Sequence, residues 1–198
     1  MELSFVPYET MLPPFATGTD AIVLIGHGAP ATDCPPELIG ELMQLQWQSG
    51  HHGCPHSGGP AHGRMAALEE QIRRWPRHPG NDPYKVGLEQ VAEALRPFFP
   101  SAQIAIGYNE FCSPSVPEVI DEVIRQGARR IFVIPSMLTP GGLHAEHDIP
   151  QALDALRSAH PAITIDYVWP FRVQDIAALL AAHAQQVMEG RAAAQLPA

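Results

Sequence analysis

Ala21–Ile25 reads AIVLI and runs directly into Gly26-His27-Gly28, and this short segment indicates the class of fold. Consecutive apolar residues that include several β-branched side chains are typical of a strand buried on both faces of a parallel sheet. The two glycines predict a turn immediately after that strand. His27 is therefore expected at the carboxyl end of a buried strand.

Strands and helices are predicted to alternate along the rest of the chain. Three more strands are expected over Gln103–Tyr108, Arg130–Pro135 and Ile163–Trp169. Helices are expected over Glu37–Gln46, Tyr84–Phe98, Ser115–Gln126, about 147–158, and Val173–Met188. This alternation implies βαβ crossovers, so we expect an α/β fold with a four-stranded parallel sheet flanked by helices. The sequence holds no second Gly-His-Gly motif and thus shows no internal repeat.

The chain divides into one domain with an unusual middle segment. Residues 1–19 predict an irregular lead-in, residues 20–190 hold the single domain, and residues 191–198 predict a flexible tail. Within the domain, residues of about 46–83 place one helix, Met65–Trp75, between stretches rich in Gly, Pro and Ser. Half of the ten histidines lie in this segment: His51, His52, His56, His62 and His78. We interpret the segment as a His-rich insertion, either a solvated loop or one that captures metal.

Composition excludes several classes of function. With 21 acidic against 12 basic residues, a net charge of -9 argues against nucleic-acid binding. The sequence has no apolar stretch of about 18 residues for a membrane span and no signal-peptide pattern, so we expect a cytoplasmic protein. Cys34, Cys54 and Cys112 are odd in number and lack a C-x-x-C pair, which argues against a disulfide framework. A phosphate-binding G-x-x-x-x-G-K-[ST] loop is also absent, so we expect no nucleotide.

Candidate chemistry gathers at the ends of three predicted strands. In open α/β sheets, ligands bind outside the carboxyl ends of the strands. His27 follows the first strand, Glu110 follows the second, and His144 follows the third. Imidazole and carboxylate together suit Co, Ni, Fe or Zn. The predicted topology therefore brings a metal site to one edge of the sheet.

Three ordered motifs carry a resemblance to a known family. They are the strand with Gly26-His27-Gly28, a G-Y-x-E-x-x-x-P-S segment over 107–115, and a G-x-H-x-x-x-D-I-P segment over 142–150. Together they resemble the class II tetrapyrrole chelatases, specifically the small sirohydrochlorin cobalto- and ferrochelatases, over roughly residues 20–46 and 84–185. The resemblance implies the flavodoxin-like half of a chelatase. It also implies a homodimer, because a single array makes only half of a two-lobed cleft.

The resemblance implies ATP-independent insertion of a divalent metal into sirohydrochlorin or a related tetrapyrrole. The metal is a substrate, Co²⁺ or Fe²⁺ with Ni²⁺ open, and no nucleotide takes part. Carried over by motif, His27 and His144 hold the metal and take pyrrole protons, while Glu110 assists ligation or proton removal. Neutral imidazole, with an ordinary pKa of about 6.5, can do either near pH 7. The competing hypothesis is a non-catalytic carrier of metal or metallo-tetrapyrrole on the same fold.

Further positions around the motifs have both a functional and a structural interpretation. We expect Ser115, Gly141 and Gly142 to contact the substrate, although the glycine pair also suits a simple backbone turn. Glu110 also suits a helix cap. Ser113 departs from the family pattern, because it stands where a second acidic residue is frequent. The other positions suggest structural roles. We expect His147 at the surface, Cys112 as a small buried hydrophobe, and Asp148 at a helix N-terminus, where its charge complements the helix dipole.

Three arginines flank Trp75 near the end of the middle segment: Arg73, Arg74 and Arg77. Arginine forms paired hydrogen bonds with carboxylates, so these side chains suit the acidic groups of a tetrapyrrole. They equally suit the solvated surface of a helix. The sequence leaves both interpretations open.

Overall fold

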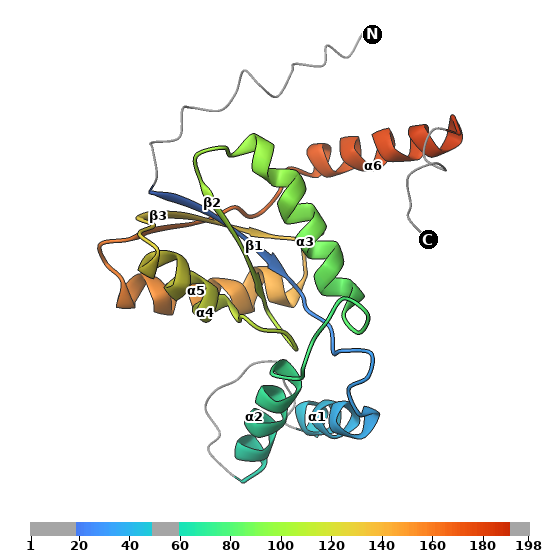
Figure 1. Cartoon of the computed structure of the whole chain (residues 1–198), viewed down its shortest axis with the longest axis vertical. Coiled ribbons are helices and arrows are strands. Elements are labelled where there is room, and N and C mark those ends of the chain that lie inside the picture. The colour runs from blue at the N-terminus through green and yellow to red at the C-terminus, as the bar shows by residue number, and fades with distance from the viewer. Residues whose placement is uncertain (1–18, 49–59, 191–198) are drawn as a thin grey trace.

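The computed structural model describes residues 19–48 and 60–190, and it has a four-stranded parallel sheet at its centre (Figure 1). Its strands are β1 (Asp20–Gly26), β2 (Gln103–Tyr108), β3 (Arg130–Pro135) and β4 (Thr164–Tyr167), in the order β2-β1-β3-β4. Every residue of β1 is buried, because β1 has a strand on each side and helices on both faces. The predicted α/β fold and parallel sheet are confirmed, with β4 shorter than expected.

Helices cover both faces of the sheet, and the alternation along β1 decides which side chain meets which helix. Val23 and Ile25 point to α4 (Val116–Arg125) and α5 (Ile149–Ala159), where the largest core cluster lies. Leu24 points to the opposite face and packs under α3 (Pro83–Leu95), which continues into a 3-10 turn over Arg96–Phe98. A strand buried on both faces is what the uninterrupted AIVLI run predicted.

A second small core lies beyond the carboxyl edge of the sheet. Helices α1 (Pro36–Gln48) and α2 (Pro60–Arg73) pack on one another there (Figure 1). Leu42 of α1 and Leu68 and Ile72 of α2 are almost fully buried. The helix expected over Met65–Trp75 is thus α2, and it contributes a core of its own. His51, His52, His56 and Cys54, like residues 1–18 and 191–198, lie outside the described residues.

Helix α6 (Val173–Met188) extends away from the rest of the structure (Figure 1). It follows β4 as predicted, yet none of its residues is buried. Apolar side chains such as Leu179, Leu180 and Met188 are exposed along it. Within the described ranges, the structure has no helix with the length and hydropathy that a membrane crossing needs.

Candidate metal centre

Three loops at the carboxyl edge of the sheet bring together His27, Glu110 and His144. One ligand atom from each residue lies within 4.8 Å of the other two. The Nε2 atom of His27 is 4.0 Å from one oxygen of Glu110, and Nε2 of His144 is 3.9 Å from the other. The imidazole ring centroids are 4.7 Å apart. All three side chains are half-buried, so the cluster is open to a ligand from solvent.

The proton on the His27 ring is placed by the backbone. Its Nδ1 lies 2.8 Å from the carbonyl oxygen of Gly28, which can only accept a hydrogen bond. Nδ1 therefore carries the hydrogen, and the Nε2 lone pair is directed to the Glu110 side. The backbone N–H of His27 donates to the hydroxyl of Tyr84 on α3, at 2.8 Å, and fixes the residue at the end of β1.

His144 has the same tautomer for a different reason. Its Nδ1 lies 2.7 Å from a carboxylate oxygen of Asp148, one helical turn further on, and a carboxylate only accepts. The side-chain amide nitrogen of Asn109 lies 2.8 Å from the same Nδ1 on the β2 side. Because the single Nδ1 hydrogen is directed to the carboxylate, Asp148 and not Asn109 fixes the tautomer. Partners of this kind orient an imidazole and raise its basicity as a metal ligand. Nε2 of His144 is left available for a metal.

A close backbone approach joins the loops that carry His27 and Glu110. The N–H of Glu110 donates to the carbonyl of His27 at 2.8 Å, and the N–H of Asn109 donates to that of Gly26 at 2.9 Å. Gly28 has φ +92, and a Cβ there would lie 1.9 Å from the carbonyl oxygen of Glu110. The second glycine of the Gly-His-Gly motif is therefore needed both for its left-handed conformation and for its lack of a side chain.

His144 begins a single π-helical turn, His144–Asp148, that leads into α5. The sequence predicted a helix over about 147–158, close to the observed α5, but it did not predict the π-helical turn in front of it. Pro150 has no N–H and its ring clashes with the carbonyl four residues back, which disfavours an ordinary α-helical turn here. The N–H of Ile149 donates instead to the carbonyl of His144. His144 and Asp148 lie on the same side of this turn, where their side chains are hydrogen-bonded.

The structure gives the expected substrate-binding residues a place at the same edge. Ser115 is the N-cap of α4, and both its N–H and its hydroxyl donate to Glu118, at 2.7 and 2.9 Å. The hydrogen bond from the backbone of Ser115 holds the pKa of Glu118 below its ordinary value. Gly141 and Gly142 are exposed, and the N–H of Gly141, at φ +86, donates to Glu146 at 2.6 Å. Substrate contact at these three positions remains a prediction.

The structure shows what two side chains next to His144, those of Asp148 and His147, contact. Asp148, which we expected only beside a helix dipole, is the hydrogen-bond partner of His144. The spacing of four residues between a histidine and an acid on one helix was the signal for this pair. His147 is exposed, as expected, and its Nδ1 lies 3.1 Å from the other oxygen of Asp148. Asn109 and Tyr84 also support the site and had no signal in the sequence.

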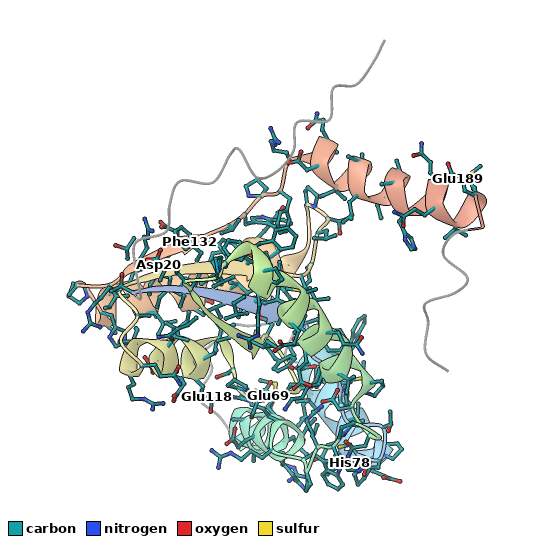
Figure 2. All side chains as sticks on the ribbon, turned by 45° about the horizontal axis from the view of Figure 1, so that its top comes forward. Asp20, Glu69, His78, Glu118, Phe132 and Glu189 are labelled. Atoms are coloured by element: carbon teal, nitrogen blue, oxygen red, sulfur yellow. The ribbon has the colours of Figure 1, made fainter. Side chains whose placement is uncertain are left out.

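The arginines around Trp75 divide into two kinds. Arg73, the last residue of α2, and Arg74, which follows it, form ion pairs with Glu70 of α2, and their charges also reach Glu118 at the start of α4. Figure 2 labels Glu118 of α4 and Glu69 of α2. Arg77, by contrast, is almost completely buried and pairs with Asp82. Arg77 is therefore not available to bind substrate carboxylates, and that alternative is wrong for this residue.

Cys112 is close to the site but has no ligand character. Burial raises the pKa of its thiol, so the neutral form dominates near pH 7. Its Sγ donates to the carbonyl of Ala29 at 3.3 Å. This agrees with the interpretation of Cys112 as a small buried hydrophobe.

The fold and this cluster belong to a known family. The CbiX family model matches residues 81–187, which is more than half of the chain. The chain belongs to the CbiX family. Glu110 and His144 lie inside the matched residues, whereas His27 precedes them.

Named relatives show the same family signature over part of their length. The chain is 37% identical over 86 residues to the sirohydrochlorin cobaltochelatase of Methanocaldococcus jannaschii, covering 42% of this chain and 58% of the relative. It is 30% identical over 70 residues to the sirohydrochlorin ferrochelatase of Bacillus subtilis, covering 35% of this chain and 26% of the relative. The match to the cobaltochelatase of Methanococcus aeolicus, 36% over 77 residues, covers 38% of this chain and 53% of that protein. The chain thus spans about half of the length of the archaeal relatives that it matches.

Solved structures with a similar arrangement are more distant in sequence. The cobalamin (vitamin B12) biosynthesis CbiX protein of Marinobacter aquaeolei VT8 is 18% identical, with a TM-score of 0.49 over 86% of this chain and 98% of that one. The sirohydrochlorin chelatase SirB of Bacillus subtilis subspecies spizizenii, in complex with cobalt, is 19% identical. Its TM-score is 0.44, over 85% of this chain and 50% of that one.

Proposed function

We propose that this protein inserts a divalent metal into sirohydrochlorin or a related tetrapyrrole without using a nucleotide. The observation that carries the proposal is the pair of imidazoles of His27 and His144, whose Nε2 atoms lie 4.0 and 3.9 Å from the two carboxylate oxygens of Glu110. Relatives in the same family carry the names sirohydrochlorin cobaltochelatase and ferrochelatase, which supports this choice of reaction.

The geometry supplies the two steps that the reaction needs. Nε2 of His27 and of His144, both unprotonated in these tautomers, can bind one metal ion together with Glu110. Three protein ligands leave coordination positions free for the pyrrole nitrogens of the incoming macrocycle. Two pyrrole N–H protons leave as the metal is transferred, and each imidazole or carboxylate that releases the metal becomes free to accept one. The same three residues therefore act first as ligands and then as bases.

The donor set also restricts the metal. Two imidazole nitrogens and one carboxylate suit Co²⁺ and Fe²⁺, with Ni²⁺ open. Mg²⁺ prefers an all-oxygen shell and gives up its water slowly, which disfavours it as the substrate. A half-buried position allows the ion to enter from solvent and to leave with the product.

The test is a metal-insertion assay on the purified protein. Metal-free sirohydrochlorin and Co²⁺ are mixed with the protein, and the change in the macrocycle's absorption spectrum is compared with the spontaneous rate. His144→Ala should remove most of the acceleration, whereas His147→Ala, an exposed neighbour on the same turn, should retain it. Tight binding of cobalt or of cobalt-sirohydrochlorin with no acceleration would favour the carrier hypothesis instead.

The proposal includes a second copy of the chain as partner. Phe132 and Ile134 of β3 alternate with Ile131 and Val133, which face α4 and α5, so they lie on the other face of the sheet and are only half-buried. Apolar α6 follows the next strand, yet extends away from this face. Exchange of α6 between two copies would cover both surfaces.

Light scattering tests the homodimer directly. The unmodified protein should have twice the chain mass of 21.5 kDa. Leu179→Arg combined with Leu180→Arg should give a monomer, whereas Gln185→Arg on the same helix should not. A monomeric unmodified protein with full activity would contradict the dimer while leaving the chemistry of the site intact.

A further inference from the structure

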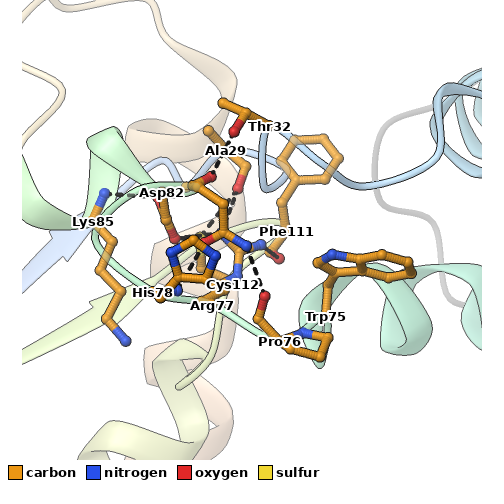
Figure 3. Close-up of polar contacts among 12 residues, drawn as sticks. Ala29, Thr32, Trp75, Pro76, Arg77, His78, Asp82, Lys85, Phe111 and Cys112 are labelled. Atoms are coloured by element: carbon orange, nitrogen blue, oxygen red, sulfur yellow. Dashed lines mark hydrogen bonds and ion pairs between the residues drawn. The ribbon is translucent and has the colours of Figure 1, made fainter.

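Arg77 lies behind the metal centre in a loop that the sequence analysis assigned to an insertion. Its side chain is 7% exposed, and that of its ion-pair partner Asp82 is 2% exposed. Figure 3 shows the guanidinium surrounded by the ends of several loops. A buried arginine is expensive unless its hydrogen bonds are satisfied, so the identity of its partners indicates what it is for.

The guanidinium holds both of the loops that present ligands from β1 and β2. Nη1 donates to the carbonyl of Ala29 at 2.9 Å, and Nη2 donates to the carbonyl of Phe111 at 2.6 Å. Ala29 is two residues after His27, and Phe111 directly follows Glu110. One planar group therefore fixes the separation of these two loops (Figure 3).

The contact to Phe111 stabilises an unusual backbone conformation. Phe111 has φ 58, in the left-handed region that a residue with a side chain rarely adopts. This conformation turns the chain immediately after Glu110, and the N–H of Cys112 donates back to the carbonyl of Glu110 at 2.6 Å. The direction of the Glu110 side chain thus depends on a bend that Arg77 holds from behind.

Asp82 connects this arrangement to a rigid element. One of its carboxylate oxygens bonds Nη1 of Arg77, and the other accepts from the N–H of Lys85 as the N-cap of α3. The same first turn of α3 carries Tyr84, whose hydroxyl accepts from the N–H of His27. The start of α3 therefore supports His27 directly and Glu110 through Arg77.

We propose that Arg77 is a positioning residue that sets the Glu110 carboxylate against the His27 and His144 imidazoles. The inference rests on the proposed metal site and adds a residue that lies outside the part matched by the family model. Arg77 itself touches neither metal nor substrate. It acts through the backbone of the two loops.

The test compares Arg77→Lys with a matched variant at a remote ion pair. Lysine keeps the charge beside Asp82 but cannot make the two directed bonds to the loop carbonyls. Arg130 pairs with buried Asp20 at the opposite end of β1, although its own side chain is more exposed than that of Arg77, so Arg130→Lys is the control for an arginine–aspartate pair remote from the site. Figure 2 labels Asp20, the partner of Arg130, and His78, the residue after Arg77, and these two lie in different parts of the molecule.

Co²⁺ alone is the probe, read by its affinity and by its visible absorption spectrum on the purified, unmodified and variant proteins. Arg77→Lys should weaken Co²⁺ binding by about 10- to 100-fold, the usual effect of losing a partner behind a metal ligand. Its cobalt spectrum should shift toward that of Glu110→Gln. Arg130→Lys should leave affinity and spectrum unchanged, even if both variants unfold at a lower temperature.

Each result decides a separate question. If Co²⁺ binding of the unmodified protein does not depend on His27 and His144, the proposed metal site itself is wrong. If that dependence holds but Arg77→Lys retains the normal affinity and spectrum, the positioning role is overturned. Should Arg77→Lys not fold, Asp82→Asn replaces it, because asparagine retains a capping oxygen and breaks the ion pair. Asp82→Asn should shift the spectrum in the same direction, and a normal spectrum would overturn the role.

Discussion

Gly28→Ala tests whether the spacing of the two loops controls the site. The N–H of Glu110 donates to the carbonyl of His27, so these loops are in direct backbone contact. A Cβ at position 28 would lie 1.9 Å from the carbonyl oxygen of Glu110, while real Cβ contacts essentially never fall below 3.0 Å. The loops must therefore move apart by about 1 Å, twice the tolerance of about 0.5 Å that a binding constellation allows.

The expected loss of stability has two parts. Alanine in the left-handed conformation costs about 1–2 kcal/mol. Loss of the hydrogen bond between the loops adds about 1 kcal/mol. For a chain of this size, a total of about 2–3 kcal/mol lowers the unfolding temperature by roughly 4–12 °C. Co²⁺ affinity should fall by about 10-fold or more, because the ligands no longer converge.

Gly127→Ala is the matched control for this experiment. Gly127 has φ +102, but a Cβ there has nothing within 4 Å, and the residue lies at the far end of α4. It should show the conformational cost alone, with Co²⁺ affinity unchanged. Thermal unfolding and Co²⁺ titration of both variants separate the cost of the left-handed backbone conformation from the steric clash with the carbonyl of Glu110. Equal unfolding temperatures, with normal Co²⁺ affinity in Gly28→Ala, would refute the reasoning.

Three further changes should have distinct effects. Asp148→Asn removes the carboxylate that orients His144 and should weaken Co²⁺ binding about 10- to 100-fold in a titration; normal affinity would contradict the assigned tautomer. Because the folded protein lowers the pKa of Glu118, this group stabilises folding above its ordinary pKa of about 4.3 and loses that effect as pH falls. Glu118→Gln should therefore flatten the acid side of the curve of unfolding temperature against pH, and an unchanged curve would disagree. Changing His51, His52 and His56 together to serine should weaken the apparent metal affinity in the metal-insertion assay without changing the reaction rate at saturating Co²⁺. Loss of activity at saturating Co²⁺ would instead mean that the His-rich segment is part of the active site.

The three candidate ligands could be predicted from the sequence because each follows a predicted strand of a parallel sheet. Five apolar residues at Ala21–Ile25 specify a strand buried on both faces, and parallel strands end at one edge. That reasoning was enough to bring His27, Glu110 and His144 together, although 82 residues separate the first from the second in the numbering. It required no knowledge of side-chain contacts.

The supporting residues could not be predicted in the same way. Arg77 lies in a stretch without periodicity, and its function depends on carbonyl groups of loops that are distant in sequence. Backbone carbonyls have no sequence signature, so only the folded chain shows that they converge. Asp148 differs, because its spacing from His144 was visible and only the competing helix-dipole explanation obscured it. The π-helical turn at His144–Asp148 also depends on Pro150, which the sequence analysis used only as part of the motif over 142–150.

The proposed metal ligands come from segments that are far apart in sequence, and under the proposed function this has a thermodynamic consequence. An ion held by His27, Glu110 and His144 cross-links three segments of the chain and binds only when the sheet has formed. At a free metal concentration 100 times the dissociation constant, such linkage stabilises the folded state by about 2.7 kcal/mol. Delivery of the ion to a product removes that contribution. The protein would then alternate, once per turnover, between a more stable loaded state and a less stable empty one.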